Sequence, residues 1–278
     1  MPNRYQECPI KDIISIKSLF TFFRRTFQYD FYFSGESHDF TEIVCIIGGS
    51  AGITADKDVY VLSAGQMIVH TPNEFHNIWP NNTDAEAEAV IFSFLASEFP
   101  PLEKKVFTLN GEQIAELCEM HKEVKDLFLL NENFLVAGIY PHREAEAAIF
   151  VKRLEVLLLN ILAAGNAAVP QYSSQSAENY ARIVDAMEKA LGGPLNVDLL
   201  AERCKLSVSA IEKTMHRYMG CGAIAHFNNL RMQRAAALLE SGKSVKEVAS
   251  VLGFSCQNYF SSAFKKWAKQ SPSAFRKQ

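Results

Sequence analysis

The feature that most constrains the fold is a pattern that occurs twice near the C-terminal end of the 278-residue chain. Each copy has an alanine, four further residues, an apolar residue and a serine, and runs over 201–207 and 249–255. A small alanine lets two helices cross closely, and a serine suits the N-cap of the second helix. Ile211 and Met215 follow one copy, and Phe260 and Phe264 follow the other, as apolar anchors. This pattern is typical of a helix-turn-helix, whose second helix enters the major groove of DNA.

The two units stand 48 residues apart, and a long helical pattern separates them. From Ala177 onward the chain is almost wholly helical in its periodicity. Two units that are rigidly joined would contact successive segments of the major groove, about one helical turn (roughly 34 Å) apart on one DNA face.

The C-terminal 100 or so residues resemble the AraC/XylS family of transcription regulators. The residues that carry the resemblance lie on the joining helix and in the second unit: Leu230-Arg231, Ala235, Leu238-Leu239, Ser244-Val245, Glu247-Val248-Ala249, Gly253-Phe254, Asn258-Tyr259-Phe260, Phe264-Lys265-Lys266, Ser271-Pro272 and Phe275-Arg276. The chain departs from the family where Lys269 replaces a glycine and where Met215-His216 replaces Phe-Lys.

The resemblance implies that exposed positions on both second helices contact bases and phosphates. These predicted DNA-binding residues are Ser209, Glu212, Lys213, His216, Arg217, Gln257, Asn258, Ser261, Ser262 and Lys265. Gln and Asn can bind adenine in a bidentate way, and Lys and Arg suit guanine edges or phosphates. Glu212 could accept from cytosine or instead serve an intramolecular partner, and Ser262 stands where the family often has Arg. Arg231 is predicted to be structural and to bridge the two units.

The charge distribution agrees with this division. Residues 177–278 hold 15 Lys and Arg against 8 Asp and Glu, whereas residues 1–176 hold 13 against 23. These differences of +7 and -10 give the net charge of -3. A basic end on an acidic body favours an end that binds a polyanion.

The preceding chain predicts an α+β multidomain protein. Residues 1–107 are predicted to form a β domain, because short runs such as 30–33 and 41–47 alternate with turn signals, as in a sandwich or small barrel. Residues 108–164 form a helical dimerisation or packing region, because apolar residues recur every three or four positions in 111–130 and 144–164. Residues 165–176 read as a linker, and 177–278 as the DNA-binding domain.

The β part resembles the cupin-like sensor domain of AraC-family members through Gly35-Glu36-Ser37-His38, Glu42, Gly65, Pro72 and His76. Glu36 stands where metal-binding cupins have their first histidine. Strand alternation would place Glu36, His38, Phe40 and Glu42 on one face, inside the barrel. We predict an effector pocket formed by Glu36, His38, Glu42, His76 and Trp79. Metal ligation and mutual hydrogen bonding remain alternatives, and His70 has no partner that the sequence reveals.

These features predict a transcription regulator that binds double-stranded promoter DNA and responds to a small molecule. The helix over 144–164 would support a homodimer. A metal-dependent cupin enzyme and a constitutive DNA-binding protein are the alternatives. The sequence predicts no catalytic residue, no metal and no cofactor. Six cysteines without a CxxC pair indicate reduced thiols, and the lack of a signal peptide or apolar span predicts a soluble, cytoplasmic protein with no membrane partner.

Overall fold

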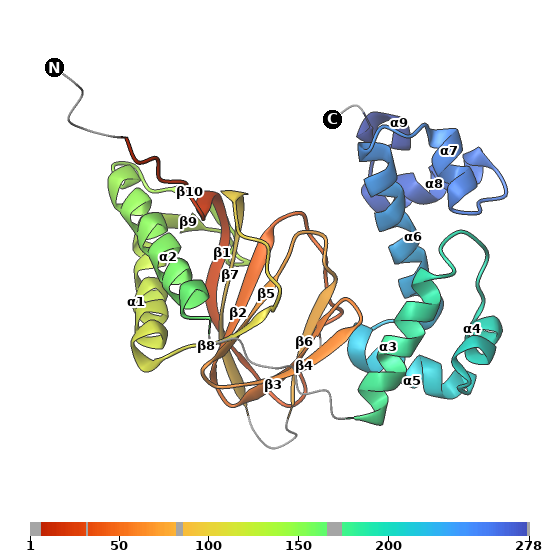
Figure 1. Ribbon diagram of the computed structural model, residues 1–278, viewed down its shortest axis with the longest axis horizontal. Helices are drawn as coiled ribbons and strands as arrows, with labels where there is room; N and C mark the ends of the chain where they lie inside the picture. The colour runs from red at the N-terminus through yellow and green to blue at the C-terminus, as the bar shows by residue number, and fades with distance from the viewer. Residues whose placement is uncertain (1–6, 32, 82–85, 166–173, 277–278) are drawn as a thin grey trace.

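A β-rich N-terminal domain packs beside a helical C-terminal domain in the computed structural model (Figure 1), which describes residues 7–31, 33–81, 86–165 and 174–276. The predicted α+β class is confirmed. Most of the predicted linker, 166–173, lies outside the described residues. None of the described helices is both long enough and apolar enough to cross a membrane.

The β domain consists of two antiparallel sheets rather than one closed barrel. The larger sheet has the strand order β1-β7-β2-β5-β8, and the smaller has the order β4-β3-β6. Apolar residues from both sheets, among them Ile46, Ile53 and Ile91, fill the space between them. The strands are β1 (Ser15–Phe27), β2 (Thr41–Gly48), β3 (Ser50–Ala55), β4 (Asp58–Ser63), β5 (Gln66–His70), β6 (His76–Pro80), β7 (Ala87–Glu98) and β8 (Val106–Thr108).

Two helices cover the outer face of the larger sheet: α1 (Gly111–Leu127) and α2 (Glu144–Ala164). A capping box between Asn110 and Gln113 starts α1. A short hairpin, β9 (Phe128–Leu130) and β10 (Val136–Ile139), separates the two helices. The sequence did not predict this hairpin. The predicted strand at 30–33 is also absent from the described residues there, because the chain turns after β1.

The helical domain begins with α3 (Gln175–Glu188) and contains both predicted helix-turn-helix units. The first unit is α4 (Val197–Cys204) and α5 (Val208–Met219), and the second is α7 (Val245–Val251) and α8 (Gln257–Ala268). The helix α6 (Ala223–Glu240) joins them, with Phe227 in the core of the first unit and Ala235 in that of the second. A short helix, α9 (Pro272–Phe275), ends the described chain.

The four predicted anchors, Ile211, Met215, Phe260 and Phe264, are fully buried. Ser207 caps α5, as predicted, by accepting from the Ala210 N–H at 3.2 Å. The equivalent prediction for Ser255 is wrong, because the turn of the second unit is longer and Cys256 is the N-cap of α8. Its Sγ accepts from the Tyr259 N–H at 3.4 Å.

Candidate functional site

A cavity of about 200 Å³ opens between the two sheets and is the candidate effector site. Its polar lining includes Glu36, Glu42, His70, His76 and Asn77, and aromatic side chains from β1 and the following segment form another part of the wall. Pockets for drug-sized ligands usually measure about 300–1,000 Å³, so this cavity suits a smaller molecule. Its further lining residues are Thr21, Phe23, Arg25, Phe27, Phe31, Phe33, Val44, Ile78, Ile91, Asn133 and Leu135.

Four of the predicted residues form a cluster beside this cavity, and three of them, Glu36, Glu42 and His76, line it. Glu36, His38, Glu42 and His76 each place a potential ligand atom within 4.8 Å of the others. The prediction that Glu36, His38 and Glu42 alternate along one strand is wrong, however, because β2 begins only at Thr41. Glu36 instead joins β6 through an isolated bridge: its N–H and carbonyl both pair with His76, at 2.9 Å each.

Glu42 is the centre of the cluster. Its carboxylate lies 3.2 Å from His76 Nε2 and 3.7 Å from His38 Nε2, and the side chain is almost wholly buried. Burial acts to raise the pKa of Glu42, but the two neighbouring imidazoles outweigh it and lower that pKa to about 2. Glu42 is therefore an anion inside the protein. For Glu36, burial and the nearby Glu42 carboxylate raise the pKa.

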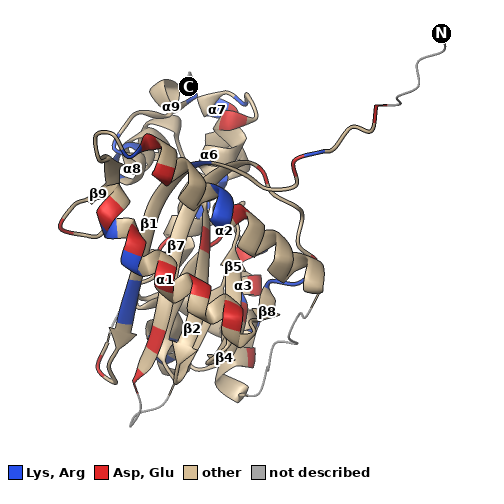
Figure 2. Cartoon of the chain, turned by 90° about the vertical axis from the view of Figure 1, so that its left-hand side faces the viewer, with Lys and Arg blue, Asp and Glu red and all other residues tan. Residues whose placement is uncertain are grey.

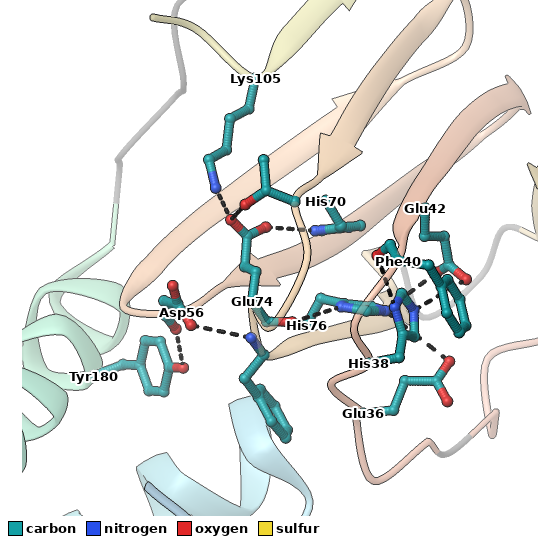
Figure 3. A network of polar contacts seen from close by, with 12 residues as sticks. Glu36, His38, Phe40, Glu42, Asp56, His70, Glu74, His76, Lys105 and Tyr180 are labelled. Carbon is teal, nitrogen blue, oxygen red and sulfur yellow. Dashed lines mark hydrogen bonds and ion pairs between the residues drawn. The ribbon is translucent and has the colours of Figure 1, made fainter. Parts of the chain in front are cut away.

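A second group of polar residues, which the sequence did not reveal, lies next to this cluster: His70, Glu74 and Lys105 (Figure 3). His70 pairs across the sheet with Glu42 and stacks on His76, with ring centroids 4.3 Å apart. Its Nδ1 lies 2.8 Å from Glu74 Oε1, and Glu74 also forms an ion pair with Lys105. The partner of His70 that the sequence did not reveal is Glu74, four residues along the chain but beyond the end of β5. Burial, followed by the proximity of His76, lowers the pKa of His70 well below its usual value.

Trp79 does not line the cavity. Its ring packs edge-on against Tyr218 of α5, with centroids 5.4 Å apart. Trp79 therefore belongs to the contact between the two domains rather than to the pocket. Trp79 pairs with Gly52 of β3, and its ring lies over that glycine, where a Cβ would collide with it.

Residues that line the cavity, or lie next to it, also contact the helical domain. Asn77, which lines the cavity, donates from Nδ2 to the Tyr218 carbonyl at 3.0 Å. Phe75 packs edge-on against His226 of α6, and its N–H donates to Asp56 Oδ1. The Tyr180 hydroxyl donates to the Asp56 carbonyl at 2.5 Å (Figure 3). Residues 75, 76 and 77 thus connect the cavity to the first helix-turn-helix unit.

The predicted DNA-binding residues lie on the two second helices. All but Glu212 and Ser261, which are partly buried, are exposed: Ser209, Lys213, His216 and Arg217 on α5, and Gln257, Asn258, Ser262 and Lys265 on α8. Glu212 accepts from the Ala223 N–H at 3.3 Å and lies 3.9 Å from His216. Its partner within the protein is therefore the start of α6, whose Gly222 N-cap has no side chain of its own.

Arg231 is structural, as predicted. Its guanidinium lies 3.9 Å from the Phe254 ring centre and 5.6 Å from that of Phe227, and it donates to the Leu252 carbonyl. It therefore connects the cores of the two units. On the face turned away from the helical domain, acidic residues recur along α1 (Figure 2).

The fold defines a class: a β domain with a small polar cavity, joined to two helix-turn-helix units. Family models agree with both parts. The AraC-like ligand binding domain matches residues 20–130, and the helix-turn-helix domain matches residues 200–278. The chain belongs to the AraC family of transcription regulators.

Some curated relatives match most of this chain, and others match only about a third of it. The Msm operon regulatory protein of Streptococcus mutans is 27% identical over 84% of this chain and 82% of its own. The HTH-type transcriptional activator RhaR of Mannheimia succiniciproducens is 24% identical over 95% of this chain and 93% of its own. The match to the HTH-type transcriptional regulator GlxA of Rhizobium meliloti, at 29% identity, covers 34% of this chain and only 30% of that protein.

Proposed function

We propose that this regulator binds promoter DNA through α5 and α8, and that a small molecule in the β-domain cavity controls this binding. The observation that carries the proposal is the position of Asn77. One side chain lines the cavity and donates to the backbone of α5. A ligand that contacts one arrangement of this side chain better than another shifts the relative population of the two arrangements.

The cavity favours this function over constitutive DNA binding. A domain that serves only to dimerise needs a filled core, whereas this one buries an ionised carboxylate and three imidazoles beside open volume. Buried polar atoms are costly unless they are paired, and Nε2 of His38, His70 and His76 has no hydrogen-bond partner among the described residues, which a bound ligand would explain. Arg25, which also lines the cavity, supplies a cation that could bind an acidic effector.

The first experiment measures binding of the full chain to its own upstream DNA and to scrambled DNA across a salt titration. We expect at least a hundredfold preference for the upstream fragment. Gln257→Ala should weaken specific binding about 5- to 150-fold, since a lost bidentate base contact costs about 1–3 kcal/mol. Lys213→Ala should lower the salt slope by about 1 if it binds a phosphate. Equal binding to both DNAs would contradict sequence-specific regulation.

Lys122→Ala is the matched control for Lys213→Ala. Lys122 is equally exposed but lies on α1, where it pairs with Glu119. This substitution should leave both the affinity and the salt slope unchanged. A loss as large as that of Lys213→Ala would mean that the effect reports overall charge and not a contact of α5.

We further propose that α2 forms a homodimer interface. Ile149 and Val156, seven residues apart on this helix, are 60% and 56% exposed. They border a shallow groove that also includes Ala148 and Asn160. The double variant Ile149→Asp/Val156→Asp should be monomeric in analytical ultracentrifugation at concentrations where the unaltered chain is a dimer. Ile10→Asp, at an equally apolar but isolated exposed position, should stay dimeric. If the double variant remains dimeric, the interface lies elsewhere.

A further inference from the structure

The imidazoles of His38 and His76 are held in the orientation of metal ligands. His38 Nδ1 lies 3.0 Å from the Phe40 carbonyl oxygen, and His76 Nδ1 lies 3.1 Å from that of Glu74. A carbonyl oxygen only accepts, so each Nδ1 must carry a proton and donate it. In the neutral ring, Nε2 is then left with a free lone pair. Histidines that bind metals are usually fixed in this way by a hydrogen bond from their other nitrogen.

Both Nε2 atoms point toward the same anion. They are buried and have no hydrogen-bond partner among the described residues, although Glu42 lies within ion-pair distance of both. A lone pair on nitrogen that faces a carboxylate oxygen at 3.2 Å is repulsive unless a positive charge lies between them. That charge is either an added proton on each ring or a metal cation.

We propose that this cluster binds one divalent first-row transition-metal ion through His38 Nε2, His76 Nε2, the Glu42 carboxylate and, as the fourth ligand, Glu36. Two nitrogen and two oxygen donors suit such ions, whereas Mg²⁺ and Ca²⁺ prefer oxygen alone. The site departs from the sequence-based prediction, which included no metal.

The geometry requires only a small adjustment. The four ligand atoms lie within 4.8 Å of one another. Ligands at about 2.1 Å from one ion lie at most about 4.2 Å apart, so they must move inward by several tenths of an ångström. Glu36 is the ligand with freedom to do so, because its side chain is half exposed and it precedes β2. His70 stays outside the set, since its Nδ1 is held by Glu74 and its ring stacks on His76.

Metal binding at this position would act directly on the domain contact. His76 stands between Phe75, which packs on α6, and Asn77, which bonds to α5. Glu36 is paired through its backbone to His76, so inward movement of Glu36 pulls on the same strand. This coupling rests on the proposed function, whereas the metal site itself does not.

The test uses the full chain, treated with a chelator and then titrated with Zn²⁺ in a calorimeter and with Co²⁺ by visible absorption. All proteins carry Cys8→Ser and Cys256→Ser, which remove the two exposed thiols as competing ligands. We expect one ion per chain and Co²⁺ bands that indicate four-coordinate nitrogen and oxygen ligation. His76→Gln and Glu42→Gln should each weaken binding at least a hundredfold. His142→Asn, an exposed histidine with positive φ that Asn tolerates, should bind as the parent does.

Thermal melting distinguishes a variant that has lost the metal site from one that has failed to fold. Zn²⁺ should raise the melting temperature of the parent and of His142→Asn, and should leave that of a folded Glu42→Gln variant unchanged. Failure of the parent to take up one equivalent, or equal uptake by Glu42→Gln, would overturn the site. Uptake that leaves the affinity for upstream DNA unchanged would overturn the coupling alone. Loss of DNA binding with and without the metal would instead count against the proposed function.

Discussion

At the scale of single residues, the most informative side chain outside the cavity is His226. It lies in the first turn of α6, is 2% exposed, and contacts Phe75 of the β domain. Its Nε2 has no hydrogen-bond partner within the described part of the chain. Burial lowers the pKa of His226 to about 4. The neutral ring is therefore required for this helix to pack against the β domain.

This pKa predicts a loss of stability on acidification. The unfolded chain takes up a proton on this histidine near pH 6.5, whereas the folded protein does so only near pH 4. The contribution is thus present above pH 6.5 and is lost as the pH falls toward 4. Between pH 7 and pH 5 it amounts to about 2 kcal/mol of unfolding free energy. His226→Phe should show a correspondingly smaller difference between urea unfolding at pH 7 and at pH 5. An identical pH dependence would contradict the assigned protonation state.

At the scale of elements, the helical domain was predictable because its signals are local. In the first unit, for example, the helix periodicity, the Ser207 cap and the buried anchors lie within a short stretch of sequence. The cavity was only partly predictable. His38, Glu42 and His76 carry chemistry that stands out, whereas Arg25 reaches the cavity only because β1 lies in the same sheet as β2, and Asn77 is marked out only by its bond to Tyr218, 141 residues further along the chain. The hairpin β9–β10 was missed because β9 falls at the end of the run 111–130, whose apolar spacing indicated a helix, and β10 is only four residues long.

One glycine controls how the two units pack together. Gly253, in the turn between α7 and α8, has φ +66°, and a Cβ there would lie 2.3 Å from the carbonyl oxygen of Gly192. Gly192 belongs to the connection between α3 and α4, so the two turns touch. Gly253 is therefore required both by its left-handed backbone and by this close approach.

Gly253→Ala should lower the unfolding free energy by more than about 1 kcal/mol, and should also reduce DNA affinity by changing the angle between α5 and α8. Urea unfolding and DNA titration measure the two effects. Gly111→Ala provides the control, since nothing lies near its Cβ position at the start of α1. If both variants are equally stable, the turn at Gly192 can move away from residue 253 without lowering the free energy of unfolding.

At the scale of the whole molecule, the arrangement of the two domains is fixed by a mixed contact. Val59 and Phe75 of the β domain are part of the same apolar cluster as the core of the first unit. Around them stand two hydrogen bonds, from Asn77 to Tyr218 and from Tyr180 to Asp56. Hydrogen bonds are directional, so these two bonds help to fix the orientation in which the apolar side chains of the two domains meet.

The double variant Asn77→Ala/Tyr180→Phe tests this contact and keeps the Tyr180 ring in the core of the first unit, although it also removes the contact of the hydroxyl with Met219 Sδ. A hydrogen bond contributes about 1 kcal/mol, so the docked arrangement should lose about 2 kcal/mol, a factor of roughly 30 in population. Scanning calorimetry should then resolve two transitions, where the unaltered chain melts as one, because each domain unfolds without stabilising the other. Tyr29→Phe, at a 73% exposed tyrosine, should melt as the parent does. A single transition in the double variant would mean that the apolar contact alone couples the domains, and Asn77 could then not transmit the state of the cavity to α5.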